Sequence, residues 1–319
     1  MNNNNSELPI IDGHVDLLYE MSRFHPDISF NEISEGPVTL EKLKTGNIRV
    51  IVTAFYCPDE YNGPGRSVKY LENLFKISDK YLTGLYKIKT GKELELCMKE
   101  EAGTIFLLEN SDALLEMGIE RLHEKGLKVA GLTHAGKNRI GDGNGVKYPD
   151  GLTKEGKKLV KFLDINGFAV DLAHLSDPCF REVIDLFKGP MISSHTGVRY
   201  FCNNPRNLSA EQIEIILQRN GIIGITINPE MLSEDNTAGI QDVFKHIDFI
   251  AQKYGADGIA LGSDLCGFDS VNNGLEDISK LKNLAELFYK RGGYPLDAIE
   301  KIMGKNWYDF YFSLFETDS

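Results

Sequence analysis

The stretch Ile10-Ile11-Asp12-Gly13-His14-Val15-Asp16 is an apolar run that ends in a histidine and an aspartate two positions apart. Along an extended strand, residues i and i+2 point to the same face, so one imidazole and one carboxylate can reach a single point. This pair is half of a metal site, although a strand that ends in a polar turn has the same pattern. The choice between these readings depends on whether other strands end in further ligands.

Seven more short runs of apolar or β-branched residues follow, and stretches of helical period lie between them. The eight predicted strands are 8–12, 49–55, 104–108, 127–132, 168–172, 191–194, 221–227 and 257–262. The predicted helices are 40–44, 66–82, 113–125, 153–165, 177–187, 209–219 and 241–254, with two more after the last strand. This alternation predicts an α/β fold, a (β/α)8 TIM-type barrel, which needs roughly 250 residues. A doubly wound open sheet is the alternative, but no G-x-G-x-x-G motif follows the first strand.

The composition is that of an ordinary globular protein, because 42% of the 319 residues are hydrophobic and 26% are charged. We expect residues 8–319 to form a single barrel domain with C-terminal helices, and the asparagine-rich residues 1–7 to form a disordered tail. The net charge of −12 argues against a nucleic-acid partner, because such a surface repels phosphate. The chain has no apolar run of about 18 residues, so we expect no membrane partner. Five scattered cysteines predict reduced thiols in a cytoplasmic protein.

Barrel enzymes carry their chemistry at the carboxyl ends of the strands. In this chain polar residues stand at those ends: His14, Asp16, Glu109, His134, His174, His195 and Asp264. Imidazole and carboxylate groups are ligands for zinc-class ions, and four of the seven histidines fall at this one kind of position. The pattern therefore predicts a metal site at the carboxyl face of the barrel.

Each of these residues also has a purely structural reading. A single histidine such as His134 is often a hydrogen-bonded loop residue. Glu109 is a sharper signal, because a carboxylate directly after four apolar residues is expensive to bury without a cation or strong donors. The same reasoning applies to Asp264. The remaining histidines, which we expect to be solvated surface residues, are His25, His123 and His246.

Several motifs in order resemble the membrane dipeptidase (renal dipeptidase) family of zinc metallopeptidases, a branch of the amidohydrolase superfamily. The motifs are Asp12-Gly13-His14-Val15-Asp16, Glu109, Leu132-Thr133-His134, Asp171-Leu172-Ala173-His174, Ser193-Ser194-His195, Asn204-Pro205-Arg206-Asn207 and Gly262-Ser263-Asp264. The resemblance runs from Ile10 to about Gly267, and several ordered motifs are more specific than any one.

The resemblance implies a two-zinc centre at the mouth of the barrel, where another divalent ion is possible. His14 and Asp16 would bind the first ion, His174 and His195 would bind the second, and Glu109 would bridge both.

The resemblance also implies catalytic and substrate-binding roles. The residue that matches His134 contacts the substrate at the scissile peptide, and the one that matches Arg206 holds the substrate carboxylate. The residue that matches Asp264 handles the proton of the bridging water. The sequence departs from the usual family pattern at Val15, at Asn110, where glycine is usual, and around Cys266, which leaves substrate preference open.

The predicted function is that of a cytoplasmic metal-dependent dipeptidase. It would hydrolyse dipeptides with a free C-terminal carboxylate, including those with a D-residue second, through a metal-bridging hydroxide. One alternative is a hydrolase of another amide, such as an N-acyl amino acid or a lactam. A second alternative is a metal-stabilised binding protein without turnover.

The C-terminal part of the chain holds an aromatic cluster: Trp307, Tyr308, Phe310, Tyr311 and Phe312. The favoured reading is that these side chains pack against the outside of the barrel. A homodimer surface is the alternative, because exposed aromatic residues concentrate at interfaces.

Overall fold

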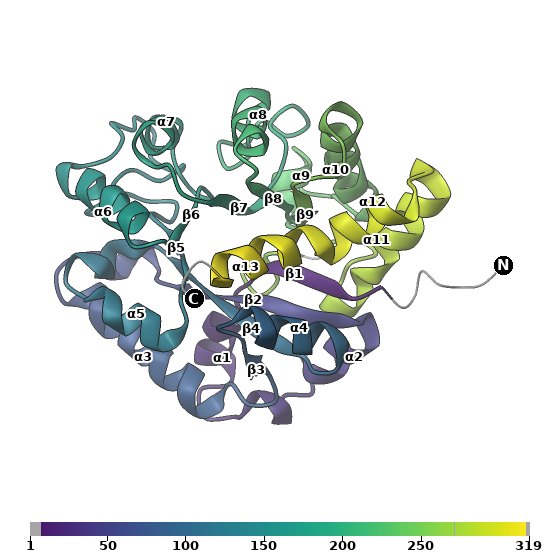
Figure 1. Cartoon of the computed structure of the whole chain (residues 1–319), viewed down its shortest axis with the longest axis horizontal. Coiled ribbons are helices and arrows are strands. Elements are labelled where there is room, and N and C mark those ends of the chain that lie inside the picture. Colours follow the sequence, from purple (N-terminus) through teal and green to yellow (C-terminus); the bar gives the residue numbers. More distant parts are fainter. Residues whose placement is uncertain (1–7, 271, 317–319) are drawn as a thin grey trace.

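Eight parallel strands form a ring with helices around it (Figure 1). The computed structural model describes residues 8–270 and 272–316, so the tail predicted at residues 1–7 lies outside the described residues. The ring strands follow the order β1 (Ile10–Val15), β2 (Ile48–Tyr56), β4 (Gly103–Glu109), β5 (Val129–Gly131), β6 (Ala169–Asp171), β7 (Met191–Thr196), β8 (Ile222–Ile225) and β9 (Ile259–Leu261). A two-residue strand, β3 (Tyr86–Lys87), pairs with β4 outside this path. The predicted (β/α)8 barrel is confirmed, and each predicted strand overlaps one ring strand.

The ring strands are buried on both faces, which explains why they read as continuous apolar runs. Alternate residues of β2 go to two different apolar clusters. Val50 and Val52 belong to the cluster that also contains Trp307, inside the barrel. Ile51 and Phe55 belong to the larger cluster between the strands and the surrounding helices. The period of two along the strand thus builds both layers of the core.

The helices are α1 (Leu17–Phe24), α2 (Leu40–Gly46), α3 (Arg66–Tyr81), α4 (Gly91–Lys99), α5 (Ile119–Lys125), α6 (Lys154–Ile165), α7 (Asp177–Leu186), α8 (Ala210–Gln218), α9 (Pro229–Leu232), α10 (Ile240–Tyr254), α11 (Lys282–Leu287), α12 (Leu296–Glu300) and α13 (Asn306–Glu316). Each predicted helix is present, but the stretch 113–125 is not continuous. It divides into a 3-10 turn (Ser111–Leu115) and α5, because Gly118 adopts extended backbone as the N-cap of α5. Helices α1, α4 and α9 were not predicted.

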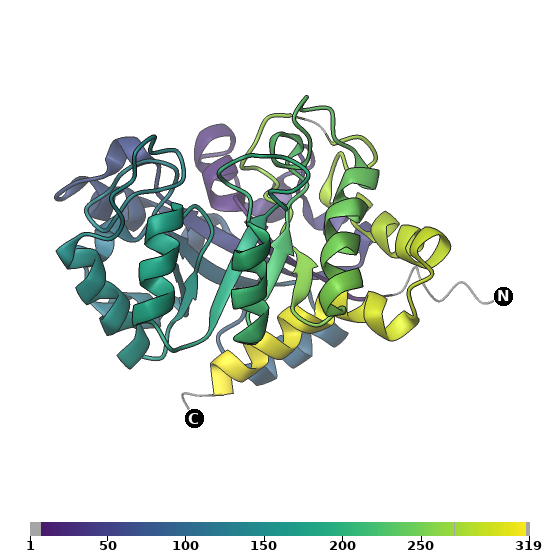
Figure 2. The same ribbon diagram turned by 90° about the horizontal axis from the view of Figure 1, so that it is seen from above.

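The C-terminal helix α13 crosses one end of the barrel (Figures 1 and 2). The Trp307 indole is fully buried and donates its N–H to the backbone oxygen of Leu261 at 2.7 Å. A Cβ atom at Gly13 would lie 2.3 Å from this ring, so β1 needs a glycine at that point. The prediction that the aromatic cluster packs against the barrel is confirmed, but the predicted location on the outside is wrong for Trp307 and Tyr311, which belong to the apolar cluster inside the barrel. The homodimer stays a prediction.

The ring closes between its first and last strands through a few contacts. The backbone N–H of Asp16 donates to Leu265 O at 2.9 Å, and the N–H of Asp264 donates to His14 O at 3.0 Å. Two more hydrogen bonds run from Ser263 to the carboxylate of Asp12. This seam fixes His14 and Asp264 relative to one another.

None of the helices in the described residues combines the length and the apolar character that a membrane span requires. All five cysteines are unpaired, and four of them are buried.

Candidate metal centre

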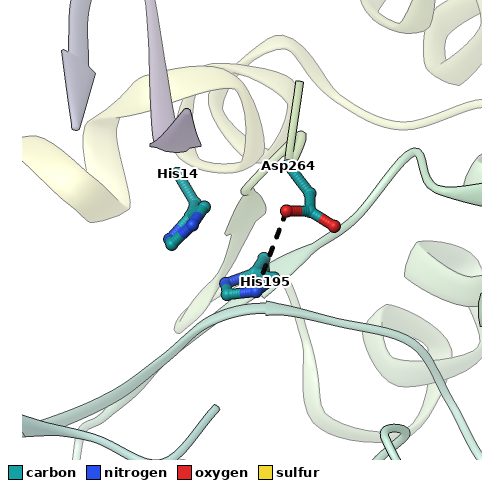
Figure 3. A group of neighbouring side chains, drawn as sticks. All are labelled: His14, His195 and Asp264. Carbon is teal, nitrogen blue, oxygen red and sulfur yellow. Dashed lines mark ion pairs between the residues drawn. The ribbon is translucent and has the colours of Figure 1, made fainter. Parts of the chain in front are cut away.

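The predicted strand-end residues converge at the carboxyl face of the barrel. Three overlapping groups of possible metal ligands occur in the described part of the chain, and the ligand atoms of each group lie within 4.8 Å of one another. The groups are His14, Asp16 and Glu109; Glu109, His174 and His195; and His14, His195 and Asp264. Figure 3 shows the third group, whose side chains come from β1, β7 and the loop after β9 and point toward one another.

Glu109 belongs to both of the first two groups. Its Oε1 atom is 2.8 Å from Nε2 of His174, and its Oε2 atom is 3.3 Å from Nε2 of His14. The Nε2 atoms of His174 and His195 lie 3.1 Å apart. Each carboxylate oxygen therefore faces a different group, which is the arrangement that a bridging ligand needs.

Several buried polar atoms of this cluster have no hydrogen-bond partner, namely Nε2 of His14, Oδ1 of Asp16 and Oε2 of Glu109. An unpaired buried polar group costs ~1–3 kcal/mol, and more if it is charged. Burial and repulsion from Glu109 raise the pKa of Asp16. A divalent cation would satisfy all three atoms, and imidazole with carboxylate is a donor set that suits zinc. The residues present therefore fit a divalent metal ion.

Strained backbone accompanies the cluster. His174 and Asp264 have φ angles of 65° and 67°, in the left-handed region that residues other than glycine rarely adopt. Asn110 also has a positive φ angle, of 68°. This is the position at which the sequence departs from the glycine usual in the dipeptidase family that it resembles. Asparagine tolerates this conformation best among residues with a side chain, so the departure is compatible with the fold.

Asp264 faces the cluster from the loop after β9, with Oδ1 3.9 Å from Nε2 of His195. Burial, followed by repulsion from Asp16, raises the pKa of Asp264 to about 7. A carboxyl group with such a pKa can take up and release a proton near neutral pH.

His134 lies beside the cluster, outside the three ligand groups. Its Nδ1 atom is 2.9 Å from Oδ2 of Asp59, which also accepts the backbone N–H of Gly136 at 2.8 Å. Burial lowers the pKa of His134, but the hydrogen bond to Asp59 and the negative charges of Glu109 and Asp59 together outweigh burial, so the pKa is raised. His134 can therefore donate a proton or a hydrogen bond into the site.

Arg206 lines a cavity of about 310 Å3 that also exposes Glu109 and Asp264. The guanidinium is buried, and its Nη2 atom has no hydrogen-bond partner. Arg199, the other arginine of this loop, is engaged, because both of its terminal nitrogens lie 2.9 Å from carboxylate oxygens of Asp177. Arg206 is therefore the cation available to an anionic group in the cavity.

Sequence reasoning missed several residues of this cavity. They are Tyr19, Tyr56, Asn144, Asn228 and Glu230. It also missed Asp59, although the rule that finds ligands at strand ends would have pointed to the end of β2, where Tyr56 is the last residue of the strand and Asp59 lies in the loop that follows.

The prediction that His246 is a solvated surface residue is wrong. The side chain is fully buried, where Nδ1 accepts the N–H of Val198 at 2.9 Å and Nε2 lies 3.1 Å from the backbone oxygen of Leu232. His246 lies on the buried face of α10 with Val243 and Ile247, and it holds the loop that follows β7. His123 is exposed as predicted, and His25 is half-buried.

The model of the membrane dipeptidase family, Peptidase family M19, matches residues 2–309 of the chain. The chain belongs to this family. The resemblance described from the ordered motifs is therefore confirmed.

Similar curated proteins include two fungal dipeptidases. Dipeptidase aclJ of Aspergillus oryzae is 24% identical over 94% of this chain and 77% of its own length. Dipeptidase tcpJ of Claviceps purpurea is 26% identical over 92% of this chain and 74% of its own length.

Solved structures share the fold. A metallopeptidase from Rhodobacter sphaeroides, bound to a phosphinate mimic of the dipeptide L-Ala-D-Ala, superposes with a TM-score of 0.85 at 22% identity, over 97% of this chain and 99% of that one. The probable dipeptidase PvdM of Pseudomonas aeruginosa has a TM-score of 0.83 at 18% identity, over 98% of this chain and 96% of that one.

Proposed function

We propose that this protein is a metal-dependent dipeptidase that hydrolyses the peptide bond of dipeptides with a free C-terminal carboxylate. One observation carries the proposal: the two ligand groups that share Glu109 open into the same small cavity as the unpaired guanidinium of Arg206. The family membership supports the same reaction.

Two zinc ions are the proposed cofactors. His14 and Asp16 would hold one ion, His174 and His195 would hold the other, and Glu109 would bridge them. When bound, two such ions make hydroxide available at neutral pH by lowering the pKa of a shared water from ~15.7 toward ~7.

Arg206 is the proposed anchor for the C-terminal carboxylate of the substrate. A planar guanidinium binds a carboxylate through two parallel hydrogen bonds, and Arg206 has a buried nitrogen without a partner. The cavity volume of about 310 Å3 is near the lower end of the ~300–1,000 Å3 typical of small-molecule sites, which favours a short substrate.

Asp264 and His134 are the proposed catalytic residues. Asp264 would accept the proton of the attacking water and deliver it to the departing amine, so that one group serves as base and then as acid. His134, held by Asp59, would donate a hydrogen bond to the oxygen of the scissile carbonyl as negative charge develops there.

Dipeptides with a D-residue in second position belong to the proposed substrates. The Rhodobacter sphaeroides neighbour binds a phosphinate mimic of L-Ala-D-Ala, which makes this class the first to test.

The test is a steady-state assay of the zinc-loaded protein with L,L and L,D dipeptides, their C-terminal amides, N-acyl amino acids and lactams. The proposal predicts turnover of the free dipeptides and weak turnover of the amides. Preferential hydrolysis of N-acyl amino acids or lactams would replace the proposal by another amidohydrolase activity. No hydrolysis of any compound by zinc-loaded protein would point to a binding protein.

A further inference from the structure

Two buried aspartate–serine pairs join neighbouring strands at the carboxyl face of the barrel. Ser263 Oγ donates to Asp12 Oδ2 at 2.5 Å across the seam between β1 and β9, and Ser194 Oγ donates to Asp171 Oδ2 at 2.5 Å between β6 and β7. In each pair the other carboxylate oxygen accepts the backbone N–H of the same serine, at 2.7 Å and 2.9 Å. The pairs thus share burial and hydrogen-bond pattern, and each is a natural control for the other.

The pairs differ in what else the serine hydroxyl contacts. Ser194 Oγ lies 3.2 Å from Nδ1 of His14 and 2.8 Å from Nδ1 of His195. The other contacts of Ser263 Oγ are backbone atoms, His14 O at 3.4 Å and Leu265 N at 3.2 Å. Ser194 therefore contacts one histidine from each of the two ligand groups that share Glu109.

The number of available hydrogens decides the direction of these bonds. A serine hydroxyl has one hydrogen and two lone pairs. The Asp171 carboxylate accepts the N–H groups of Ala173 and Ser194 on Oδ1, so Oδ2 is left to take the Ser194 hydrogen. The two lone pairs of Ser194 are then open to one N–H from each imidazole. Nδ1 of both rings must carry the hydrogen, which leaves Nε2 as the ligand atom.

We propose that Asp171 and Ser194 are positioning residues that hold a hydrogen on Nδ1 of both His14 and His195 and so present both Nε2 atoms to the metal ions. The centroids of the two rings lie 3.7 Å apart, as expected when both rings donate a hydrogen bond to one hydroxyl. This inference rests on the proposed function for the identity of the metal ligands. It adds a single hydrogen-bond network that sets the orientation and the position of the hydrogen in one histidine ligand of each ion.

Asp171→Asn is the sharpest variant. The new Oδ1 keeps the two backbone hydrogen bonds, and the amide NH2 replaces Oδ2 and donates to Ser194. Ser194 then has room to accept from one imidazole only, and it gives its own hydrogen to Nδ1 of the other. One of the two histidines is therefore forced to lose its Nδ1 hydrogen. Ser194→Ala removes the hydroxyl from both rings and serves if Asp171→Asn does not fold.

The readout is the 1H–15N spectrum of zinc-free protein labelled with 15N-histidine, which reports whether Nδ1 of His14 and of His195 carries a hydrogen. The native protein is expected to show both Nδ1 hydrogens, protected from exchange with water. Asp171→Asn should lose one of them, and Ser194→Ala should lose the protection of both. The matched controls, Asp12→Asn and Ser263→Ala, should keep both.

Zinc dissociation constants from chelator competition give a second readout. Asp171→Asn should raise the dissociation constant of one of the two zinc ions by roughly 10- to 100-fold. This is the usual scale when a residue that hydrogen-bonds to a metal ligand is lost. A bare Nδ1 on either ring in the native protein would overturn the inference, as would a fall in zinc affinity with both Nδ1 hydrogens retained. Equal changes in Asp12→Asn would also overturn it. Failure of dipeptide turnover would overturn the proposed function instead, because these spectra need neither zinc nor substrate.

Discussion

His134 and Asp59 form a hydrogen bond of 2.9 Å between Nδ1 and a carboxylate oxygen, at the edge of the candidate metal centre. The same carboxylate accepts the backbone N–H of Gly136 at 2.8 Å, so the loop after β5 and the loop after β2 meet on one group. This contact fixes the ring of His134 and leaves Nε2 available to the cavity.

Asp59→Asn should lower kcat roughly 10- to 100-fold, because it keeps the shape but removes the charge that orients His134. Zinc content should stay native, since Asp59 is outside the ligand groups. Measurements of kcat and of bound zinc check this, with Glu60→Gln as the control in the same 3-10 turn. A native kcat in Asp59→Asn would mean that the orientation of His134 does not matter for the reaction.

Arg206→Met should lower kcat/KM for dipeptides by about 3 kcal/mol of transition-state binding, or roughly 10²-fold, as expected when one partner of a charge-assisted pair is removed. The native enzyme should lose a similar amount with a C-terminal amide. Arg199→Met is the control, because Arg199 is paired with Asp177 and should affect stability more than kcat/KM. Equal turnover of acid and amide would remove Arg206 from this role.

Asp264→Asn separates a proton carrier from a metal ligand. The amide keeps the size and an oxygen but cannot take up a proton, so kcat should fall by roughly 10²-fold or more. Zinc content and inhibitor binding should remain near native, and the exposed neighbour Asp269→Asn should behave like the native protein. Loss of zinc in proportion to loss of activity would make Asp264 a ligand, and His134 would then have to carry the proton.

His246 should make stability depend on pH. Burial lowers the pKa of His246 from 6.5 to about 4, so between these values the unfolded chain binds more protons than the folded one. The stabilisation from the neutral imidazole is complete above pH 6.5 and is lost as the pH falls toward 4, by about 3 kcal/mol at most.

Urea unfolding at pH 7.5 and 4.5 checks this, with His246→Gln compared to the native protein. Glutamine can make both hydrogen bonds without titrating, so the native protein should lose more stability on acidification than His246→Gln. His25→Gln, at a half-buried histidine just after α1, should follow the native protein. Identical pH dependence of native protein and His246→Gln would show that His246 does not titrate in this way.

Much of the fold was predictable because barrel strands are buried on both faces and leave continuous apolar runs. The convergence of His14, Glu109 and His195 was also predictable, because the carboxyl ends of parallel strands meet at one face of a barrel. The position of each residue at the end of its strand was enough to predict that these side chains lie close together, without knowledge of any contact between them.

Other features depend on contacts between segments that are distant in the sequence. His246 looks polar and exposed along α10, yet its partners are backbone groups of Val198 and Leu232. The role of Ser194 in orienting His14 and His195 depends on Asp171 from the neighbouring strand, which accepts the hydrogen of the Ser194 hydroxyl. Such pairings have no period along the chain, and sequence patterns therefore do not reveal them.

The number of zinc ions that the protein binds tests the account most directly. Chelator-stripped protein is titrated with zinc, desalted and analysed for bound metal. The two ligand groups that share Glu109 predict two ions per chain, and one partly filled site when His14 and Asp16 are both replaced by alanine. At most one ion per chain in zinc-saturated native protein would contradict the account.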